Sequence, residues 1–337
     1  MGGVGGKRGP GFRVGAMTRK ILFLFLALLA STPACDRDAA EGDALLPGTW
    51  QELTPMPHAR TENSVAAADG RIWVMGGFEA RHEAETAVDV FDPATGTWKT
   101  PTRVPLGVNH AGLAEVDGRL YLIGGYRHGT FEAIDRVQVY DVAADEWTEG
   151  TPMPTGRGAL AVAVVDGRIH AIGGVKSDGG VSAAHEVYDP ASGHWERRSP
   201  MPTRREHLAA AAMGGRIYVA AGRSGGRNLD AFEIYDVAAD AWSQGPDVPT
   251  DRSGVAAVIL DGRFYLFGGE EIFGLFRDTF DEAERFDPAT GAWDVVAPMP
   301  TARHGLGAAV LDGAIYVVGG GPEPGFTFSG ANERFEP

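Results

Sequence analysis

The sequence predicts an all-β fold assembled from six repeated units, and two features of the chain indicate it. The first is a glycine doublet or near-doublet that returns at steps of 48, 49, 48, 47 and 51 residues. This interval is longer than the repeat of helical solenoids. The second is an Asp-Gly pair between two apolar runs, a strong hairpin signal because both turn positions favour positive φ. The doublets are Gly76-Gly77, Gly124-Gly125, Gly173-Gly174, Ala221-Gly222, Gly268-Gly269 and Gly319-Gly320.

Each unit contains four short predicted strands. The first is a small apolar run that follows a Pro-x-Pro motif, and the second is a continuous apolar run such as Ile72-Trp73-Val74-Met75, which predicts burial on both faces. After a variable loop, the third strand carries an acidic residue and an aromatic-Asp corner, and the fourth carries a tryptophan. No segment of the array has the length and period of a helix. The turns between the first two strands are Asp69-Gly70, Asp117-Gly118, Asp166-Gly167, Gly214-Gly215, Asp261-Gly262 and Asp312-Gly313.

These landmarks resemble the kelch repeat, and the resemblance covers residues 48–337. It implies a six-bladed β-propeller with four antiparallel strands per blade. The last unit ends at Pro337 without a tryptophan, whereas Trp50 precedes the first complete unit. We therefore expect the strand around Trp50 to supply the outer strand of the last blade and to close the ring.

The N-terminal residues 1–34 read as a secretory signal segment. Arg19-Lys20 precedes an apolar run of ten residues, too short to span a bilayer, and Met17 is the expected true start. The Ala34-Cys35 pair resembles a bacterial lipoprotein cleavage box, although Thr32 and Pro33 depart from it. We expect lipidation at Cys35, a tether over residues 35–47 and a location on the periplasmic or cell-surface side of a bacterial membrane. Ordinary signal cleavage that leaves a free thiol is the alternative.

The charge of the chain argues against nucleic acid as a partner. Five of the 30 basic residues precede residue 35, so 25 basic residues accompany 45 acidic ones in the remainder, a formal net charge of −20. We expect a monomer that contacts the membrane only through its lipid anchor.

The candidate binding surface is the face that carries the loops between blades and the loops between the second and third strands, because the latter differ most in length and chemistry. An arginine recurs there in five units, and guanidinium groups around a channel mouth would suit an anionic ligand. The alternative is structural, since these arginines could pair with the third-strand acids Asp89, Glu186, Glu233, Glu284 and Glu333. The five arginines are Arg60, Arg157, Arg205, Arg252 and Arg303; Val108 replaces the arginine in the second unit.

Three histidines follow these positions, namely His110, His207 and His304. With Glu206 they could act as acid-base groups, although packing roles are the simpler interpretation. No spacing predicts a metal site, and we expect no cofactor. Two loops carry apolar residues that suit a partner or form a lid, and these are Ile272, Phe273, Leu275, Phe276, Phe326 and Phe328.

Two classes of function follow from this sequence. The first is a non-catalytic module that binds a protein segment or a glycan through the variable-loop face. The alternative is a carbohydrate enzyme, because exported six-bladed kelch proteins include sugar mutarotases of the sialic acid type, which act on a sugar acid. Copper-radical galactose oxidation is disfavoured because its cofactor needs a cysteine inside the propeller, and Cys35 lies outside it. A converging Glu/His/Arg pocket would favour an enzyme, and an open groove would favour a binding module.

Overall fold

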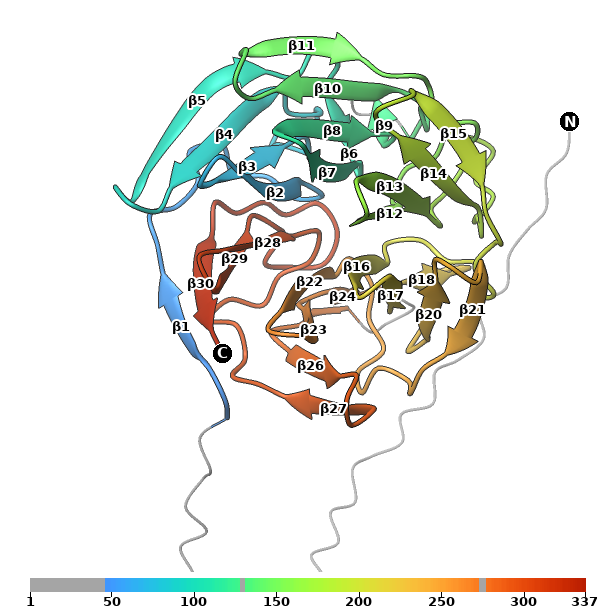
Figure 1. Ribbon diagram of the computed structural model, residues 1–337. Helices are drawn as coiled ribbons and strands as arrows, with labels where there is room; N and C mark the ends of the chain where they lie inside the picture. Colours follow the sequence, from blue (N-terminus) through green and yellow to red (C-terminus); the bar gives the residue numbers. More distant parts are fainter. Residues whose placement is uncertain (1–45, 128–130, 273–276) are drawn as a thin grey trace, which may run out of the picture. The chain divides into compact units, whose positions relative to one another are not determined.

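The computed structural model describes residues 46–127, 131–272 and 277–337, all of which fall in the second of the chain's two units, Leu45–Pro337. This unit is a six-bladed propeller in which each blade is an antiparallel sheet of four strands (Figure 1). The signal segment and nearly all of the tether, with Cys35, lie outside the described residues. Among the residues that are described, no helix is long and apolar enough to cross a membrane.

The strands occupy four positions from the axis outward. The innermost strands are β2 (Ser64–Ala68), β7 (Gly112–Val116), β12 (Ala161–Val165), β16 (Ala209–Met213), β22 (Ala256–Leu260) and β28 (Gly307–Leu311). The second strands are β3 (Arg71–Met75), β8 (Arg119–Ile123), β13 (Arg168–Ile172), β17 (Arg216–Ala220), β23 (Arg263–Phe267) and β29 (Ala314–Val318). The third strands are β4 (Ala87–Asp92), β10 (Val137–Asp141), β14 (His185–Asp189), β20 (Phe232–Asp236), β26 (Ala283–Asp287) and β30 (Asn332–Glu336). The outer strands are β5 (Thr97–Arg103), β11 (Glu146–Glu149), β15 (His194–Arg197), β21 (Ala241–Gln244), β27 (Ala292–Val295) and β1 (Thr49–Glu52).

The turns between the first two strands have the predicted conformation. Asp117 and Gly118, for example, have φ angles of 50° and 75°, as a two-residue hairpin with the right-handed twist of its strands requires. The second strands are buried almost throughout, as their continuous apolar runs predict; in β23 the side chains from Phe264 to Phe267 are fully buried. The repeat therefore encodes the hairpin and the buried middle of every blade.

The ring closes through the N-terminal strand, as the position of Trp50 predicts. Strand β1 pairs antiparallel with β30, and Trp50 lies opposite Phe335 (Figure 1). The two rings are 4.9 Å apart between centroids, and Phe335 is fully buried. The last blade thus contains strands from both ends of the array, so its edge is covered.

The six outer-strand tryptophans also join neighbouring blades. Each indole N–H donates a hydrogen bond to the preceding blade. The acceptor lies on the outer strand of that blade or in the loop that follows this strand. The pairs are Trp50 with Ala297 O (2.8 Å), Trp98 with Thr54 O (2.8 Å), Trp147 with Thr102 Oγ1 (3.1 Å), Trp195 with Thr151 O (2.8 Å), Trp242 with Ser199 O (2.8 Å) and Trp293 with Pro246 O (3.0 Å).

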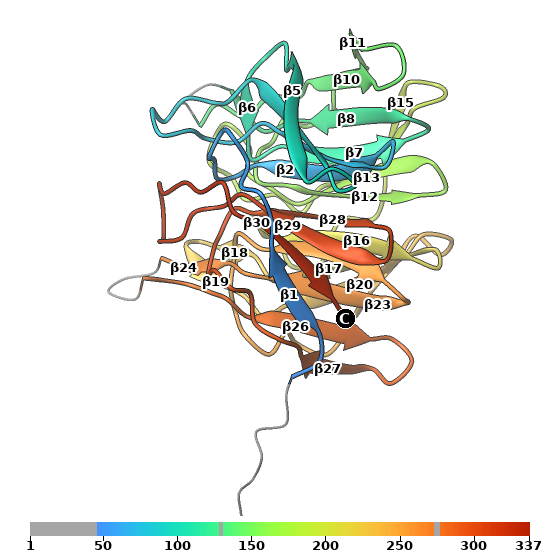
Figure 2. The ribbon, with the colours of Figure 1, turned by 90° about the vertical axis from the view of Figure 1, so that its left-hand side faces the viewer.

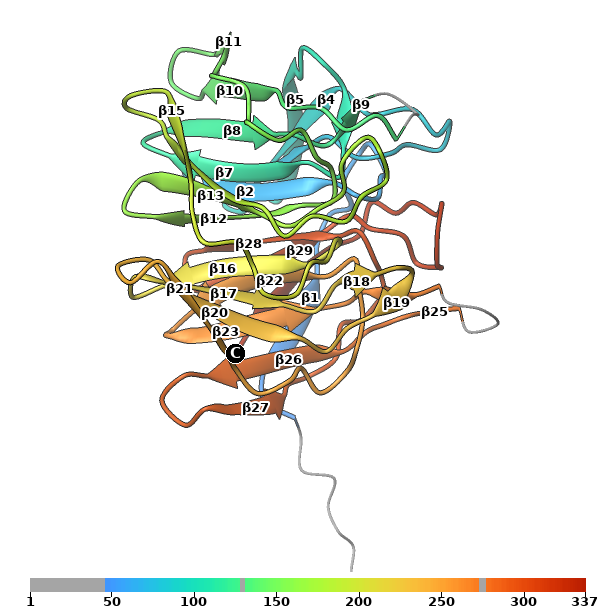
Figure 3. The ribbon, with the colours of Figure 1, turned by 90° about the vertical axis from the view of Figure 1, so that its right-hand side faces the viewer.

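Six short strands lie outside the four-stranded sheets and gather on one face of the propeller (Figures 2 and 3). They form three two-stranded ribbons. The ribbons are β6 (Val108–Asn109) with β9 (Tyr126–Arg127), β18 (Arg223–Ser224) with β19 (Arg227–Asn228), and β24 (Glu270–Glu271) with β25 (Asp278–Thr279). This face carries the variable loops, so we call it the variable-loop face.

Candidate functional site

The five repeated arginines are buried within the blades. Each has no exposed surface and pairs with the third-strand acid of its own blade, which confirms the structural alternative. Arg157 Nη1 lies 2.6 Å from Glu186 Oε2, and Arg157 Nη2 donates to Ala171 O at 2.8 Å. Burial lowers the pKa of Arg157, and the charge of Glu186 opposes that shift.

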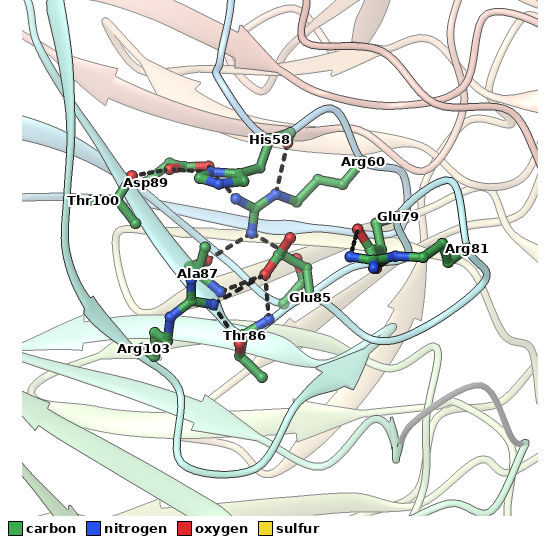
Figure 4. A network of polar contacts seen from close by, with 11 residues as sticks. His58, Arg60, Glu79, Arg81, Glu85, Thr86, Ala87, Asp89, Thr100 and Arg103 are labelled. Carbon is green, nitrogen blue, oxygen red and sulfur yellow. Dashed lines mark hydrogen bonds and ion pairs between the residues drawn. The ribbon is translucent and has the colours of Figure 1, made fainter.

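The first blade shows the same arrangement in detail (Figure 4). Arg60 pairs with Asp89, which also accepts a hydrogen bond from Thr100 at 2.7 Å and lies 2.9 Å from His58 Nδ1. Arg60 further donates to the carbonyl oxygen of Gly76, directly after the second strand, at 3.1 Å and to that of Ala87 on the third strand at 2.9 Å. The guanidinium group therefore holds the second and third strands together, and its charge is neutralised inside the blade.

The second blade replaces both members of the ion pair. Val108 stands at the arginine position and Gln138 at the acid position, and both are buried. The Gln138 amide exchanges two hydrogen bonds with the backbone of Leu106, at 2.8 and 3.0 Å. A neutral pair thus fills the place of the ion pair without leaving a charge unpaired.

The expectation of an anionic ligand at these arginines is therefore wrong in its premise. It rested on five guanidinium charges that face a channel mouth, whereas all five arginines are fully buried and none of them lines the cavity at the centre of the variable-loop face. Their charges are cancelled by Asp89, Glu186, Glu233, Glu284 and Glu333 within the blades.

The centre of the variable-loop face is built from the two residues that follow the arginine position and the one that follows the glycine doublet. In every blade the first residue after the arginine position forms an antiparallel bridge with the residue after the doublet, as Glu206 does with Arg223. The second residue after the arginine position has a positive φ in all six blades. We call these six residues the mouth ring, and they are Glu62, His110, Ala159, His207, Gly254 and Gly305.

Backbone hydrogen bonds join the mouth ring into a closed circle. The amide of each member donates to the carbonyl oxygen of the member in the preceding blade, over distances of 2.6 to 3.1 Å. The circle includes the bond from Glu62 to Gly305, which joins the first blade to the last. Four members are not glycine and still adopt the left-handed conformation, which is uncommon for side-chain-bearing residues. The circle thus fixes the direction of the Glu62, His110 and His207 side chains.

Substitution of the two ring glycines should separate strain from crowding. A Cβ atom on Gly305 would lie 2.5 Å from Thr61 Oγ1 and 2.6 Å from Glu62 Oε1, whereas the nearest atom to one on Gly254 is 3.3 Å away. We expect Gly254→Ala to cost about 1 kcal/mol, the cost of the left-handed conformation, and Gly305→Ala about 1–2 kcal/mol more. Chemical denaturation measures the loss of stability in each variant. Equal losses would show that the Thr61 and Glu62 side chains move aside without cost.

A cavity of about 440 Å³ opens at the mouth ring. All of its lining residues come from the connections between blades or from the loops between second and third strands, the two sets that the sequence assigns to this face. The charged, histidine and aromatic side chains of the lining are Glu62, Phe78, His110, Tyr126, Phe131, Lys176, Glu206, His207, Arg223, Glu270, His304 and Phe326.

One side of the cavity floor is a network of charged groups around Arg223. Its Nε donates to Glu206 at 2.8 Å and its Nη1 to Glu270 at 2.9 Å. Burial opposes ionisation of Glu206, but His207 and Arg223 outweigh burial and lower the pKa of Glu206 to about 2. His304 Nε2 lies 3.5 Å from Glu270 Oε2. The two carboxylates thus hold Arg223, and its charge is neutralised within the network.

His207 links this network to Glu62 and His110. Its Nδ1 hydrogen-bonds Glu206, and its Nε2 lies 3.1 Å from Arg223 Nη2. The His110 ring lies 4.8 Å from that of His207, and Nδ1 of His110 is 2.7 Å from Asn109 Oδ1. Burial, with the nearby charges of His207 and Arg223, places the pKa of His110 well below its usual value. His110 is therefore neutral at pH 7.

The fold also brings together three groups of the kind that bind metals. Glu62, His110 and His207 each offer one ligand atom, and these atoms lie within 4.8 Å of one another. The sequence spacing does not reveal this grouping, because the three residues come from three different blades.

Aromatic side chains from three consecutive blades line one side of the cavity. Phe78 and Tyr126 are buried and pack edge-on against His110, with centroids 5.6 and 5.3 Å away. Phe326 extends this arc from Phe78, and Phe131 extends it from Tyr126. The two outer rings are 52% and 62% exposed, so they stand at the rim.

Comparison with known proteins identifies the repeat. The KLHDC2/KLHL20/DRC7 Kelch-repeats domain matches residues 111–320, and the Kelch motif matches residues 59–103. The chain belongs to the kelch-repeat family.

Two curated kelch proteins match short parts of the chain. Kelch-like protein terF of Aspergillus terreus (strain NIH 2624 / FGSC A1156) is 44% identical over 55 residues, which are 15% of this chain and 12% of that protein. Kelch-like protein 21 of Danio rerio is 35% identical over 60 residues, 17% of this chain and 10% of that protein. The matches thus span about a tenth of each relative. The solved structure of YjhT has a TM-score of 0.72 and 17% identity, over 83% of this chain and 96% of that chain, a likeness in fold alone.

The sequence-based candidates of this kelch propeller separate into two groups. His110, His207 and His304 line the cavity together with Glu206, whereas the arginines do not. Sequence reasoning missed Glu62, Arg223 and Glu270. The repeat held a signal for them, because Glu62 aligns with His110 and His207 in the mouth ring, and Arg223 and Glu270 both follow a glycine doublet. Of the predicted apolar loop residues, Ile272 and Phe326 line the cavity, whereas Phe328 packs against His82. Phe273, Leu275 and Phe276 lie outside the described residues.

Proposed function

We propose that this propeller is a binding module that holds a segment of a partner protein on its variable-loop face. The observation that carries this proposal is the cavity, which lies where six rigid blades converge and is walled by the loops that differ most between blades. Kelch propellers generally mediate protein interactions, and two exposed aromatic rings stand at the rim. Such rings are frequent anchors in protein interfaces.

Substitution at the rim tests this proposal. The full-length protein would be screened against an array of short peptides, and the affinities of the peptides that bind would be measured by calorimetry. Phe326→Ala should weaken binding about threefold to tenfold, as the loss of an aromatic contact does. Val295→Ala is the matched control, since Val295 is a 50% exposed apolar residue on the outer strand β27. Peptide binding that survives Phe326→Ala but is lost in the control would place the partner elsewhere.

A second candidate is acid-base chemistry on a small sugar. It is favoured by the convergence of Glu206, His207 and Arg223 in an enclosed cavity, the arrangement that general acid-base catalysis needs. The three floor carboxylates would repel a sugar acid, so a neutral sugar fits this site better. Anomeric exchange followed by NMR tests it with a panel of neutral sugars and sugar acids. Acceleration that is lost in Glu206→Gln would support an enzyme, and exchange at the uncatalysed rate with every sugar would reject it.

Export and lipid anchoring at Cys35 are part of the same proposal. They are supported by the charged and apolar pattern of residues 19–30 and by the cysteine that follows it. Cys35→Ser should move the protein from the membrane fraction to the soluble exported fraction, because the acyl chains would supply the attachment. Cell fractionation and mass spectrometry measure this. A wild-type protein that is soluble and carries no lipid would favour ordinary signal cleavage.

A further inference from the structure

The floor of the cavity carries an excess of negative charge. Among the described residues that line it, the carboxylates are Glu62, Glu206 and Glu270, and the one guanidinium is that of Arg223. With histidine left out of the count, these four groups carry a formal charge of −2. Lys176 also lines the cavity, but its ammonium lies 3.1 Å from the carboxylate of Asp178, which cancels it at the rim.

Glu62 is the carboxylate that remains open to a ligand. Arg223 donates to the other two, whereas none of the described residues donates a hydrogen bond to Glu62. The nearest groups are His110 Nε2 at 3.4 Å and His207 Nε2 at 3.9 Å. Nδ1 of His110 lies 2.7 Å from the oxygen of Asn109, an acceptor, so the ring donates its proton there, and in the uncharged ring the Nε2 lone pair faces Glu62. Two acceptors that face each other lack a donor between them.

The walls of the cavity suit a cation as well. The arc from Phe326 through Phe78 and Tyr126 to Phe131 lines the same cavity as Glu62. Aromatic faces attract ammonium and guanidinium groups, and more strongly where water is excluded. An anion would meet three carboxylates, and a purely apolar group would leave Glu62 desolvated without a partner.

We infer that the cavity takes the ammonium or guanidinium group of a lysine or arginine in the partner segment, with Glu62 as its counter-ion. This inference rests on the proposed function and names the group that the segment inserts. The ammonium or guanidinium N–H groups supply the donor that Glu62 and His110 Nε2 lack, and the aliphatic stem packs between the aromatic rings.

Four capped tripeptides test the inference, Ac-Gly-X-Gly-NH₂ with X as Lys, Arg, Gln or Glu. Binding to the full-length protein is measured by calorimetry at pH 8, where ordinary histidines are neutral. We expect the Lys and Arg peptides to bind at least tenfold more tightly than the Gln peptide, and their affinity to fall as salt is raised. The Glu peptide should not bind.

Matched variants locate the effect. Glu62→Gln should lower the affinity for the Lys peptide about tenfold and leave the affinity for the Gln peptide unchanged. The control Glu146→Gln removes an equal charge from the remote outer strand β11 and should change neither affinity. Phe131→Ala, at an exposed rim position that the fold does not need, should weaken the Lys peptide about threefold.

Three results would overturn the inference. If the Lys, Arg, Gln and Glu peptides all bind with equal affinity, the cavity does not select a cationic group, although the propeller still binds peptides. Binding of neutral sugars with no binding of any peptide would reject the proposed function as well. The third result is tight binding of Zn²⁺ that Glu62→Gln abolishes and that prevents the Lys peptide from binding. It would show that Glu62, His110 and His207 form a metal site.

Discussion

Removal of strand β1 should leave the propeller open and sharply less stable. Deletion of residues 46–53 exposes the edge of β30, uncovers the buried ring of Phe335 and removes the Trp50 hydrogen bond to Ala297. We expect a loss of at least several kcal/mol in the free energy of unfolding, because a buried aromatic alone contributes about 3–5 kcal/mol. Thermal and chemical denaturation measure the loss.

A pair of tryptophan substitutions controls this deletion. Trp50→Ala and Trp98→Ala remove the same type of residue from outer strands, each with one hydrogen bond to the preceding blade. The two should destabilise the protein by similar amounts, and each should cost less than the deletion. A deletion variant as stable as the parent protein would mean that the ring does not depend on this closure.

Arg157→Val should destabilise the protein by about 3–5 kcal/mol, because it leaves the buried carboxylate of Glu186 without its partner. The variant introduces one of the two replacements found in the second blade, where Val108 stands at the arginine position. Chemical denaturation measures the free energy. Arg168→Ala is the control, since Arg168 is half exposed and lies 3.6 Å from Asp189; it should change the stability by less than about 0.5 kcal/mol.

The double variant Arg157→Val/Glu186→Gln completes the imitation of the second blade. The amide that Glu186→Gln introduces could bond the backbone of Thr155 as Gln138 bonds that of Leu106, and no charge would remain buried. We expect the double variant to recover more than half of the loss caused by Arg157→Val. If Arg157→Val is instead fully stable, the arginine is not a structural group of the blade.

The strands and turns of this fold could be predicted from the sequence because their signals are local. The Asp-Gly pairs need positive φ at both turn residues, and the apolar runs of the second strands need burial on both faces. The closure by β1 could be predicted for a related reason, since the repeat leaves one tryptophan too few at its end and one too many at its start.

The direction of the arginine side chains could not be decided from the sequence. A residue near a channel mouth can point toward the axis or into its own blade, and the repeat fixes its position without fixing that choice. The substitution in the second blade held part of the answer. Val108 occurs with Gln138, so the arginine and the acid are lost together, as members of a buried pair would be.

Only some of the residues on the floor of the cavity could be predicted from the sequence. His110, His207 and His304 stand out because histidine is rare in this chain, whereas Glu62 is one of 45 acidic residues. What distinguishes Glu62 is its place in the mouth ring, and that ring depends on hydrogen bonds between residues about 48 positions apart. Such contacts follow from the closed propeller and not from any local pattern.

NMR mapping of the Lys tripeptide on the labelled full-length protein tests most directly that the variable-loop face is the binding surface. The account predicts shifts of the His110 and His207 ring signals and of the amides around Glu62, with no change at the Asp-Gly turns of the opposite face, such as Gly118 and Gly262. Shifts confined to those turns, with His110 and His207 unchanged, would contradict it.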